Sequence, residues 1–150
     1  MKKLSHVDSS GRADMVDVSQ KPLQFRVAKA SGFISIDRQT LDLISVNQMK
    51  KGDVLCVARI AGIQAAKETS HLIPLCHTLL ISKAEVECTI TDTGVAVWAI
   101  VKSTGQTGVE MEALTAVSVA LLTVYDMCKA ADKNMIISDI RLNEKTKTDL

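Results

Sequence analysis

The sequence predicts an α+β domain of the ferredoxin-like type, in which helices pack on one face of an antiparallel sheet. Its expected elements follow the order strand, helices, strand–turn–strand, helix, strand, which is that of a split βαβ unit. The best strand signal is a strict alternation over residues 95–101, and the best helix signal is a long apolar run over residues 107–129. The 150 residues are typical of one domain.

The first half of the chain is expected to form one strand and two helices. Loose alternation predicts the strand over residues 24–36. Asp37 can cap a short helix over residues 38–46, and Asp53 can cap a second over residues 54–70, because a carboxylate accepts hydrogen bonds from the free amides of a first turn. The second helix is expected to let another element approach closely, since it carries small residues: Ala58, Ala61, Gly62, Ala65 and Ala66.

The second half is expected to form a hairpin, a long helix and a closing strand. Residues 79–91 have a strand pattern, and residues 92–94 form the turn into the alternating strand. The long helix then covers residues 107–129, and residues 135–142 close the sheet. A flexible arm is predicted over residues 1–22, before a single catalytic domain over residues 23–150.

The composition excludes several classes of protein. A formal net charge of +1 lacks the basic face of a general nucleic-acid binder, and 3% aromatic residues leave few platforms for stacking bases. No uninterrupted apolar run reaches the roughly 18 residues of a membrane span. The four cysteines form no C-x-x-C pair and follow no signal peptide, so we expect reduced thiols and a cytoplasmic protein.

The long helix combines an apolar pattern with ionisable residues, and this conflict indicates a functional site. Thr107 and Glu110 fit a capping box, which would give Glu110 a structural role, but Glu112 has no such explanation. Asp126 and Lys129 could be a weak surface ion pair, yet their apolar neighbours favour a site.

Glu112 and Asp126 are 14 residues apart, or about 21 Å along a helix. One small ligand cannot easily contact both in a single chain. The ligand is long, the two ends belong to different sites, or neighbouring subunits complete each pocket. We favour the last alternative and expect an oligomer.

Short loops supply further candidates. His77 follows Pro74 and Cys76 in a loop and can shuttle protons or donate hydrogen bonds; metal binding is a weak alternative, because adjacent residues rarely chelate one ion well. Lys51 precedes a helix start, where free amides favour phosphate. Residues 103–108 offer a second anion-binding turn.

Six motifs together resemble the family of cyclic pyranopterin monophosphate synthase, molybdenum cofactor biosynthesis protein C. The similarity covers about residues 5–145, and the motifs lie at residues 15–18, 51–53, 58–67, 72–77, 107–116 and 125–130.

The resemblance implies a homohexamer, a trimer of dimers, with sites at subunit interfaces. It implies conversion of (8S)-3′,8-cyclo-7,8-dihydroguanosine 5′-triphosphate, made by an upstream radical enzyme, into cyclic pyranopterin monophosphate and pyrophosphate. It implies a catalytic group of Asp126, Lys129 and Lys51, with the first two as an acid–base pair. The substrate-binding residues that it implies are Leu75, Cys76, His77, Glu110, Met111, Glu112, Arg26, Asp17 and Lys145.

Three points stay open in the sequence. The family has a Gly-rich, Lys-containing tail after the last strand, which is shorter here, and Lys147 can substitute for its lysine. The sequence shows no required cofactor and no metal ligands, and it does not decide whether Mg²⁺ assists. The alternatives are a non-catalytic nucleotide-binding oligomeric module and a simpler nucleotide cyclase.

Overall fold

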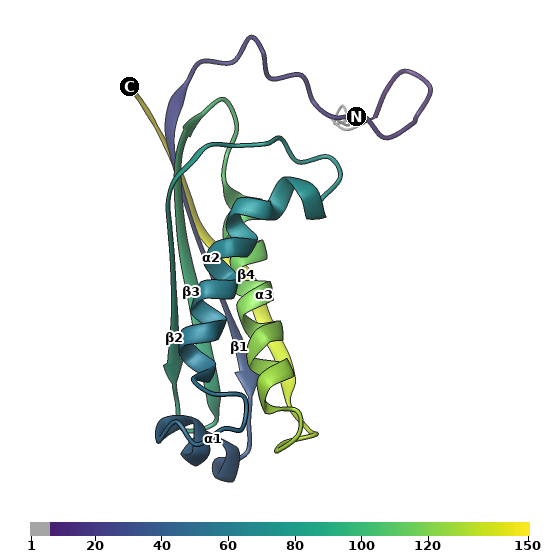
Figure 1. Ribbon diagram of the computed structural model, residues 1–150. Helices are drawn as coiled ribbons and strands as arrows, with labels where there is room; N and C mark the ends of the chain where they lie inside the picture. Colours follow the sequence, from purple (N-terminus) through teal and green to yellow (C-terminus); the bar gives the residue numbers. More distant parts are fainter. Residues whose placement is uncertain (1–6) are drawn as a thin grey trace.

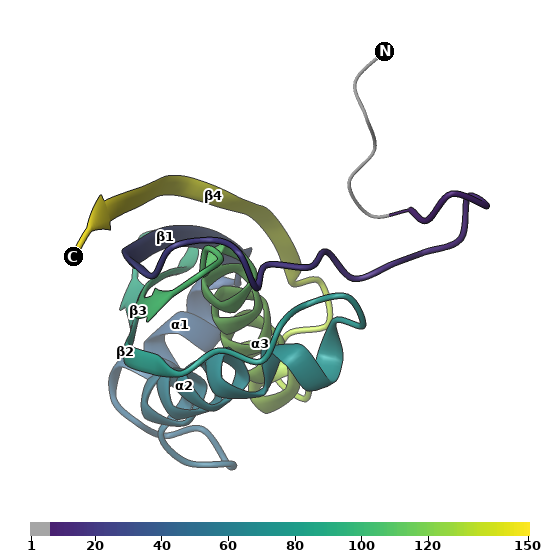
Figure 2. The same ribbon diagram turned by 90° about the horizontal axis from the view of Figure 1, so that it is seen from above.

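Four antiparallel strands form one sheet, and three helices lie on one of its faces (Figures 1 and 2). The computed structural model describes residues 7–150. The elements in chain order are β1 (Gln24–Ser35), α1 (Arg38–Ser45), α2 (Val54–Leu72), β2 (Ile81–Ile90), β3 (Gly94–Gly105), α3 (Glu110–Cys128) and β4 (Ile136–Asp149). The predicted α+β class is confirmed.

The strand order is β2-β3-β1-β4, and every neighbouring pair is antiparallel. Because β1 and β2 both pair with β3, they run in the same direction and need a crossover, which α2 provides. A parallel pair with one strand inserted between its members is the split βαβ arrangement. The order therefore agrees with the predicted ferredoxin-like topology.

The two predicted aspartate caps are present. The carboxylate of Asp37 accepts from the Thr40 amide at 2.7 Å, and that of Asp53 accepts from the Cys56 amide at 3.0 Å. These caps satisfy amides that have no partner inside the helix. As a result α1 and α2 begin at the residues that the sequence predicts.

The small residues of α2 allow it to lie directly against α3, as Figure 1 shows. A Cβ added to Gly62 would lie 2.9 Å from the carbonyl oxygen of Ala116, so the two backbones approach too closely for any side chain there. Gly32 in β1 leaves room for side chains of α3, since its Cβ would lie 2.7 Å from Leu121 Cδ1. Glycine at these two positions thus allows α2, α3 and the sheet to pack closely.

The predicted capping box at the start of α3 is wrong. The helix begins at Glu110, and Val109 occupies the cap position without a side-chain hydrogen bond. The Glu110 carboxylate instead accepts a hydrogen bond from Lys145 of β4 at 2.9 Å. An ammonium partner is a stronger attraction for a carboxylate than a neutral amide is.

The closing strand is longer than predicted. It was expected to end at residue 142, but β4 pairs with β1 as far as Gln24 opposite Asp149. The apolar pattern disappears beyond residue 142 because this edge strand is exposed. Backbone pairing with β1, which the sequence pattern does not display, continues the strand, and charged side chains protect the edge.

The helix α3 is long and apolar enough to span a membrane by length and composition, and it is the one such helix among residues 7–150. In the structure 56% of its most apolar window is buried. It contacts α2 on one side and the sheet on another, as the core helix of a globular domain does.

Residues 7–22 contain one isolated bridge, Val7 to Ala13, and otherwise no regular structure. They extend away from the sheet in Figures 1 and 2. The side-chain amide of Gln106 donates to the carbonyl oxygens of Ser19 and Lys21 and so fixes the end of this arm beside β1. The predicted arm boundary lies two residues before β1; residues 1–6 lie outside the described residues, and flexibility of the arm stays a prediction.

Candidate functional site

A cavity of about 380 Å³ lies between the arm, the loop after α2 and the start of α3. We call it the arm cavity. Six of the predicted substrate-binding residues line it: Leu75, Cys76, His77, Glu110, Met111 and Glu112. Residues far apart in the sequence meet here because the C-terminal end of α2 and the N-terminal end of α3 both lie near the arm.

His77 joins the loop after α2 to the arm. Its Nε2 lies 2.7 Å from the carbonyl oxygen of Val16. A carbonyl only accepts, so Nε2 carries the proton in this contact. In the neutral ring Nδ1 is then an acceptor, and His77 can receive a proton from a ligand.

Asp17 does not line the arm cavity. Its carboxylate accepts from the hydroxyl and the amide of Ser19, and these hydrogen bonds, with a smaller effect of the His77 charge, lower its pKa. The predicted substrate contact of Asp17 therefore stays a prediction. In this structure its carboxylate stabilises a local turn by accepting hydrogen bonds from Ser19.

Glu112 is a buried carboxyl group at the cavity wall, with only 4% of its surface exposed. Burial raises its pKa above the ordinary value, and the negative charge of Glu110 raises it further. Burial and Glu112 together raise the pKa of the Cys76 thiol. A raised pKa makes a carboxyl group a stronger candidate for donating a proton to a ligand than an exposed glutamate is.

A second hollow of about 340 Å³ adjoins the first and contains Arg26, Glu110 and Lys145. Burial alone would raise the pKa of Glu110, but the hydrogen bond from Lys145 and the charges of Lys145 and Arg26 outweigh it and lower the pKa. The surroundings of Glu110 thus favour its ionised form, whereas the burial of Glu112, two residues later, disfavours the ionised form. One short helical segment supplies carboxyl groups with opposite tendencies.

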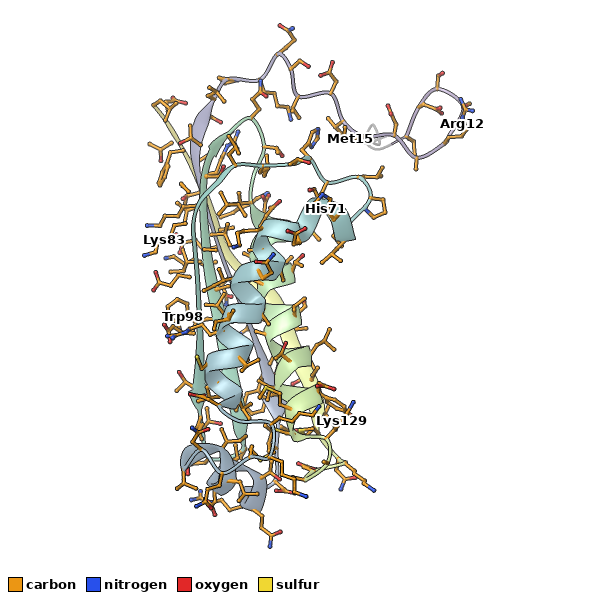
Figure 3. The ribbon with its side chains drawn as sticks, viewed as in Figure 1. Arg12, Met15, His71, Lys83, Trp98 and Lys129 are labelled. Atoms are coloured by element: carbon orange, nitrogen blue, oxygen red, sulfur yellow. The ribbon has the colours of Figure 1, made fainter. Side chains whose placement is uncertain are left out.

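Lys51, Asp126 and Lys129 form a separate group at the other end of α3, which we call the lysine–aspartate cluster. The Asp126 carboxylate accepts from Lys51 at 2.7 Å and from Lys129 at 2.8 Å. The Lys51 ammonium also donates to the Asp126 backbone carbonyl at 3.0 Å. Figure 3 shows Lys129 at the end of α3 remote from the arm.

The charges in this cluster reinforce one another. Hydrogen bonds from Lys129 and Lys51 lower the pKa of Asp126 to about 2, and the bond to Asp126 raises the pKa of Lys129. At neutral pH one carboxylate therefore holds two ammonium groups. The cluster has a net positive charge and protons to donate, which suits a phosphate oxygen or a developing oxyanion.

The predicted site residues are thus divided between the two ends of α3. Glu112 and Asp126 are separated by 14 helical residues, about 21 Å. The separation that the sequence predicts is confirmed by the continuous helix. Within one copy of the chain the structure does not bring the lysine–aspartate cluster to the arm cavity.

The structure adds residues that the sequence alone did not identify. Val16 and Val18 come from the arm, and Leu79 follows the loop after α2. In the sequence, Lys21 is notable only as part of the Lys-Pro pair that interrupts regular structure before β1. In the structure, it lines the arm cavity. The signal that could have identified it is its position, since a lysine directly before a strand that carries Arg26 lies near that arginine.

Residues 7–150 contain no group of three or more His, Cys, Asp and Glu side chains arranged to hold a metal ion. Cys76 and His77 line the same cavity as Glu110 and Glu112, but among the described residues these side chains are not grouped closely enough to hold a metal ion. The four cysteines, Cys56, Cys76, Cys88 and Cys128, are free thiols.

Comparison with known proteins assigns this arrangement to a family. The model of the MoaC family matches residues 15–148, which include both ends of α3 and every predicted site residue. The chain belongs to the MoaC family. A cyclic pyranopterin monophosphate synthase of Desulfitobacterium hafniense is 58% identical over 145 residues, covering 96% of this chain and 89% of that protein.

Two further relatives have the same name. The cyclic pyranopterin monophosphate synthase of Peptoclostridium acidaminophilum is 51% identical over 144 residues, covering 96% of this chain and 92% of the relative. That of Cereibacter sphaeroides strain KD131 is 58% identical, covering 95% and 91% respectively. The similarity therefore extends over nearly the whole length of each protein.

Proposed function

We propose that this protein converts (8S)-3′,8-cyclo-7,8-dihydroguanosine 5′-triphosphate into cyclic pyranopterin monophosphate and releases pyrophosphate. The observation that carries the proposal is the lysine–aspartate cluster within a chain of the MoaC family. A module that only binds nucleotides would need an anion-binding pocket but no such proton-donating group. This argues against the non-catalytic alternative.

The reaction needs proton transfers during ring opening and closure, followed by phosphoryl transfer. In the last step a sugar hydroxyl forms a bond to the α-phosphorus, and the bond from that phosphorus to the bridging oxygen breaks. The hydroxyl proton passes to a base, and pyrophosphate leaves with the electron pair. Ammonium groups such as Lys51 and Lys129 stabilise the charge on the phosphate oxygens, and Asp126 can accept a proton.

The arm cavity suits the base and sugar of the substrate. Leu75, Cys76 and Met111 provide apolar surface, whereas His77 and Glu112 provide groups that exchange protons. A mostly apolar wall with a few convergent polar groups is typical of small-molecule sites. We propose that His77 and the two glutamates orient the base and the sugar.

We propose that a second copy of the chain brings its lysine–aspartate cluster to the arm cavity of the first. Two exposed apolar surfaces support assembly. Figure 3 shows Trp98 and Lys83 on the sheet face away from the helices, where Trp98 and Phe25 are each 37% exposed. On the helices Ile60 is 59% and Leu122 58% exposed. Two kinds of interface are what a homohexamer built as a trimer of dimers requires.

We propose that Mg²⁺, if it takes part, enters bound to the triphosphate of the substrate, because Mg²⁺ commonly binds through substrate phosphates. A substrate of this kind must come from a radical enzyme upstream. We also propose a reducing compartment such as the cytoplasm, since the four cysteines are free.

Product analysis tests the proposed function. The purified protein is incubated with the cyclised nucleotide, and the pterin product and pyrophosphate are both quantified. Equal amounts of the two products are expected. A parallel incubation with GTP should release no pyrophosphate; release from GTP alone would favour a simpler nucleotide cyclase. Tight binding without product would favour the non-catalytic module.

A further inference from the structure

Asp132 is a buried carboxylate that the proposed chemistry does not use. It lies in the turn between α3 and β4, and only 4% of its surface is exposed, whereas its neighbours Ala131 and Lys133 are exposed. Aspartate is rarely buried to this extent unless its oxygens are paired, because a charge removed from water is costly. The partners of this carboxylate therefore show what it does.

Each carboxylate oxygen of Asp132 accepts a hydrogen bond from a backbone amide. One accepts from the Asn134 amide at 2.8 Å, within the turn itself. The other accepts from the Asp37 amide at 2.8 Å, from a residue 95 positions earlier in the chain. Asp37 is the cap of α1, since its own carboxylate accepts from the Thr40 amide. Asp132 thus fastens the turn after α3 to the start of α1.

The two segments that Asp132 joins carry the two halves of the lysine–aspartate cluster. Asp126 lies in the last turn of α3, and Lys129 is the cap residue of that helix. Lys51 comes from the loop between α1 and α2 and donates to the Asp126 carboxylate at 2.7 Å. Figures 1 and 3 show α1 at the same end of the molecule as Lys129. A bond between the two segments therefore sets the distance between the two halves of the cluster.

The ion pairs of the cluster are poorly suited to fix that distance by themselves. The side chains are 48% exposed for Lys51, 55% for Asp126 and 56% for Lys129. Ion pairs between exposed side chains contribute little, because water and salt screen them. Hydrogen bonds from amides to a buried carboxylate are charge-assisted and shielded from water, so they are stronger. The bonds of Asp132 are the better support for the cluster.

We propose that Asp132 is a positioning residue for the reaction, which holds the turn after α3 against the start of α1 and so keeps Lys51 beside Asp126. This inference rests on the proposed function, in which the cluster acts on the substrate. Asp132 itself is buried and does not contact the substrate. Loss of its bonds should loosen the cluster and leave the arm cavity, at the other end of α3, unchanged.

The first test needs no substrate. Hydrogen bonds from Lys129 and Lys51 lower the pKa of Asp126 to about 2, so a looser cluster should give a higher pKa. In Asp132→Asn one terminal atom of the side chain can no longer accept from an amide. We expect the NMR signal of the Asp126 carboxyl group to change more in this variant than in the wild type between about pH 6 and about pH 3.5. Circular dichroism checks that both proteins stay folded.

The second test is steady-state kinetics with the cyclised nucleotide. Asp132→Asn should lower kcat by roughly 10- to 100-fold with little change in KM, because a displacement of about 1 Å in a catalytic group has an effect of this order. The double variant Asp126→Asn/Asp132→Asn should have the kcat of Asp126→Asn alone, since both changes disable one cluster. A further loss in the double variant would contradict a role that acts through Asp126.

A second pair of variants tests the same bond from its donor side. Asp37→Pro removes the amide that Asp132 accepts from, and the φ of −65° at this position suits proline. Asp37→Ala is the matched control, because it also removes the cap of α1 but keeps the amide. We expect Asp37→Pro to lower kcat as Asp132→Asn does and Asp37→Ala to stay near the wild type. Equal kcat values for the two Asp37 variants would overturn the inference.

Val101→Ala is the control for a loss of stability alone, because it opens a cavity at a fully buried position in β3. It should keep the wild-type kcat. A raised Asp126 pKa in Asp132→Asn, together with wild-type protein that does not turn over the nucleotide, would contradict the proposed function and support the positioning role. An unchanged Asp126 titration in folded Asp132→Asn would overturn the inference whatever its kcat, as would an equal loss of kcat in Val101→Ala.

Discussion

At the scale of single residues, Asp126 decides the chemistry of its cluster. With a pKa lowered to about 2 it is ionised at neutral pH, and its hydrogen bond with Lys129 raises the pKa of that lysine. It lies at an exposed position, so its ion pairs contribute little to folding. A residue with strong local bonds and little structural value is a good candidate for a catalytic group.

We expect Asp126→Asn to lower kcat by about 10²- to 10⁴-fold with little change in the thermal unfolding temperature, because a positioned acid–base group contributes on that order. Turnover of the cyclised nucleotide and a thermal melt measure the two effects. Asp139→Asn is the matched control, since Asp139 has φ of 57°, a conformation that asparagine tolerates. Wild-type turnover in folded Asp126→Asn and Lys129→Ala variants would refute the assignment.

Glu112 predicts a dependence of stability on pH. Its pKa in the folded protein is raised above 4.5, so the folded state binds the proton more tightly than the unfolded state. The free energy of unfolding therefore decreases as the pH rises from the unfolded pKa through the raised folded pKa, and then levels. Below the unfolded pKa the group is protonated in both states, so it adds no dependence of the free energy of unfolding on pH.

We expect Glu112→Gln to remove this decrease. The unfolding free energy of the variant minus that of the wild type should therefore be larger near pH 8 than near pH 4. Urea unfolding at several pH values measures it. Glu87→Gln, at a partly exposed position with a long ion-pair distance of 3.8 Å to Arg59, serves as the control. Parallel pH profiles for wild type and Glu112→Gln would show that burial does not perturb this carboxyl group.

The identity of the important residues could be predicted better than their arrangement. The charges at both ends of an apolar helix identify Glu112, Asp126 and Lys129, because such residues conflict with the local pattern. Lys21 could not be found in this way, since a lysine in a polar segment conflicts with nothing. Its place depends on a long-range contact with Gln106.

At the scale of elements, the contact between α2 and α3 keeps both ends of the site in place. We expect Gly62→Ala to destabilise the protein by about 1–3 kcal/mol, because its Cβ would lie 2.9 Å from a backbone oxygen and the helices must separate. Chemical denaturation measures the change. Gly105→Ala is the control, since its Cβ would have ordinary contacts at 3.7 Å or more. A Gly62→Ala variant as stable as Gly105→Ala would show that the helices adjust freely.

The predicted ends of helices and strands were correct where residues near in sequence determine them. They were wrong where contacts with distant segments determine them. The aspartate caps fix the starts of α1 and α2, and both partners of each cap are near in sequence. The start of α3 and the end of β4 depend on Lys145 bonding Glu110 and on pairing with β1. Neither contact leaves a pattern in the segment that it changes.

At the scale of the whole molecule, the proposed sharing of sites between copies gives a strong test. A mixture of Asp126→Asn and Glu112→Gln subunits, unfolded and reassembled together, should regain activity. If each site takes one end from each of two copies at random, about a quarter of the sites contain no substitution. The activity of the mixture, compared with each variant reassembled alone, measures this.

Size-exclusion chromatography with light scattering should give a mass near that of six chains for the wild type and for the mixture. Activity of the mixture equal to the sum of the separate variants would place a complete site within one copy. The same result with a monomeric mass would exclude sharing altogether.

In the proposed assembly, the helix α3 fixes the distance between two groups that would act in different copies. Shortening or lengthening it by one turn would move both ends relative to their partners, and by symmetry would misalign every site of the assembly at once. Changes in chain length should therefore be tolerated in the turn at residues 92–94, but not in α3. In such an assembly, the length of α3 sets the geometry of every site together.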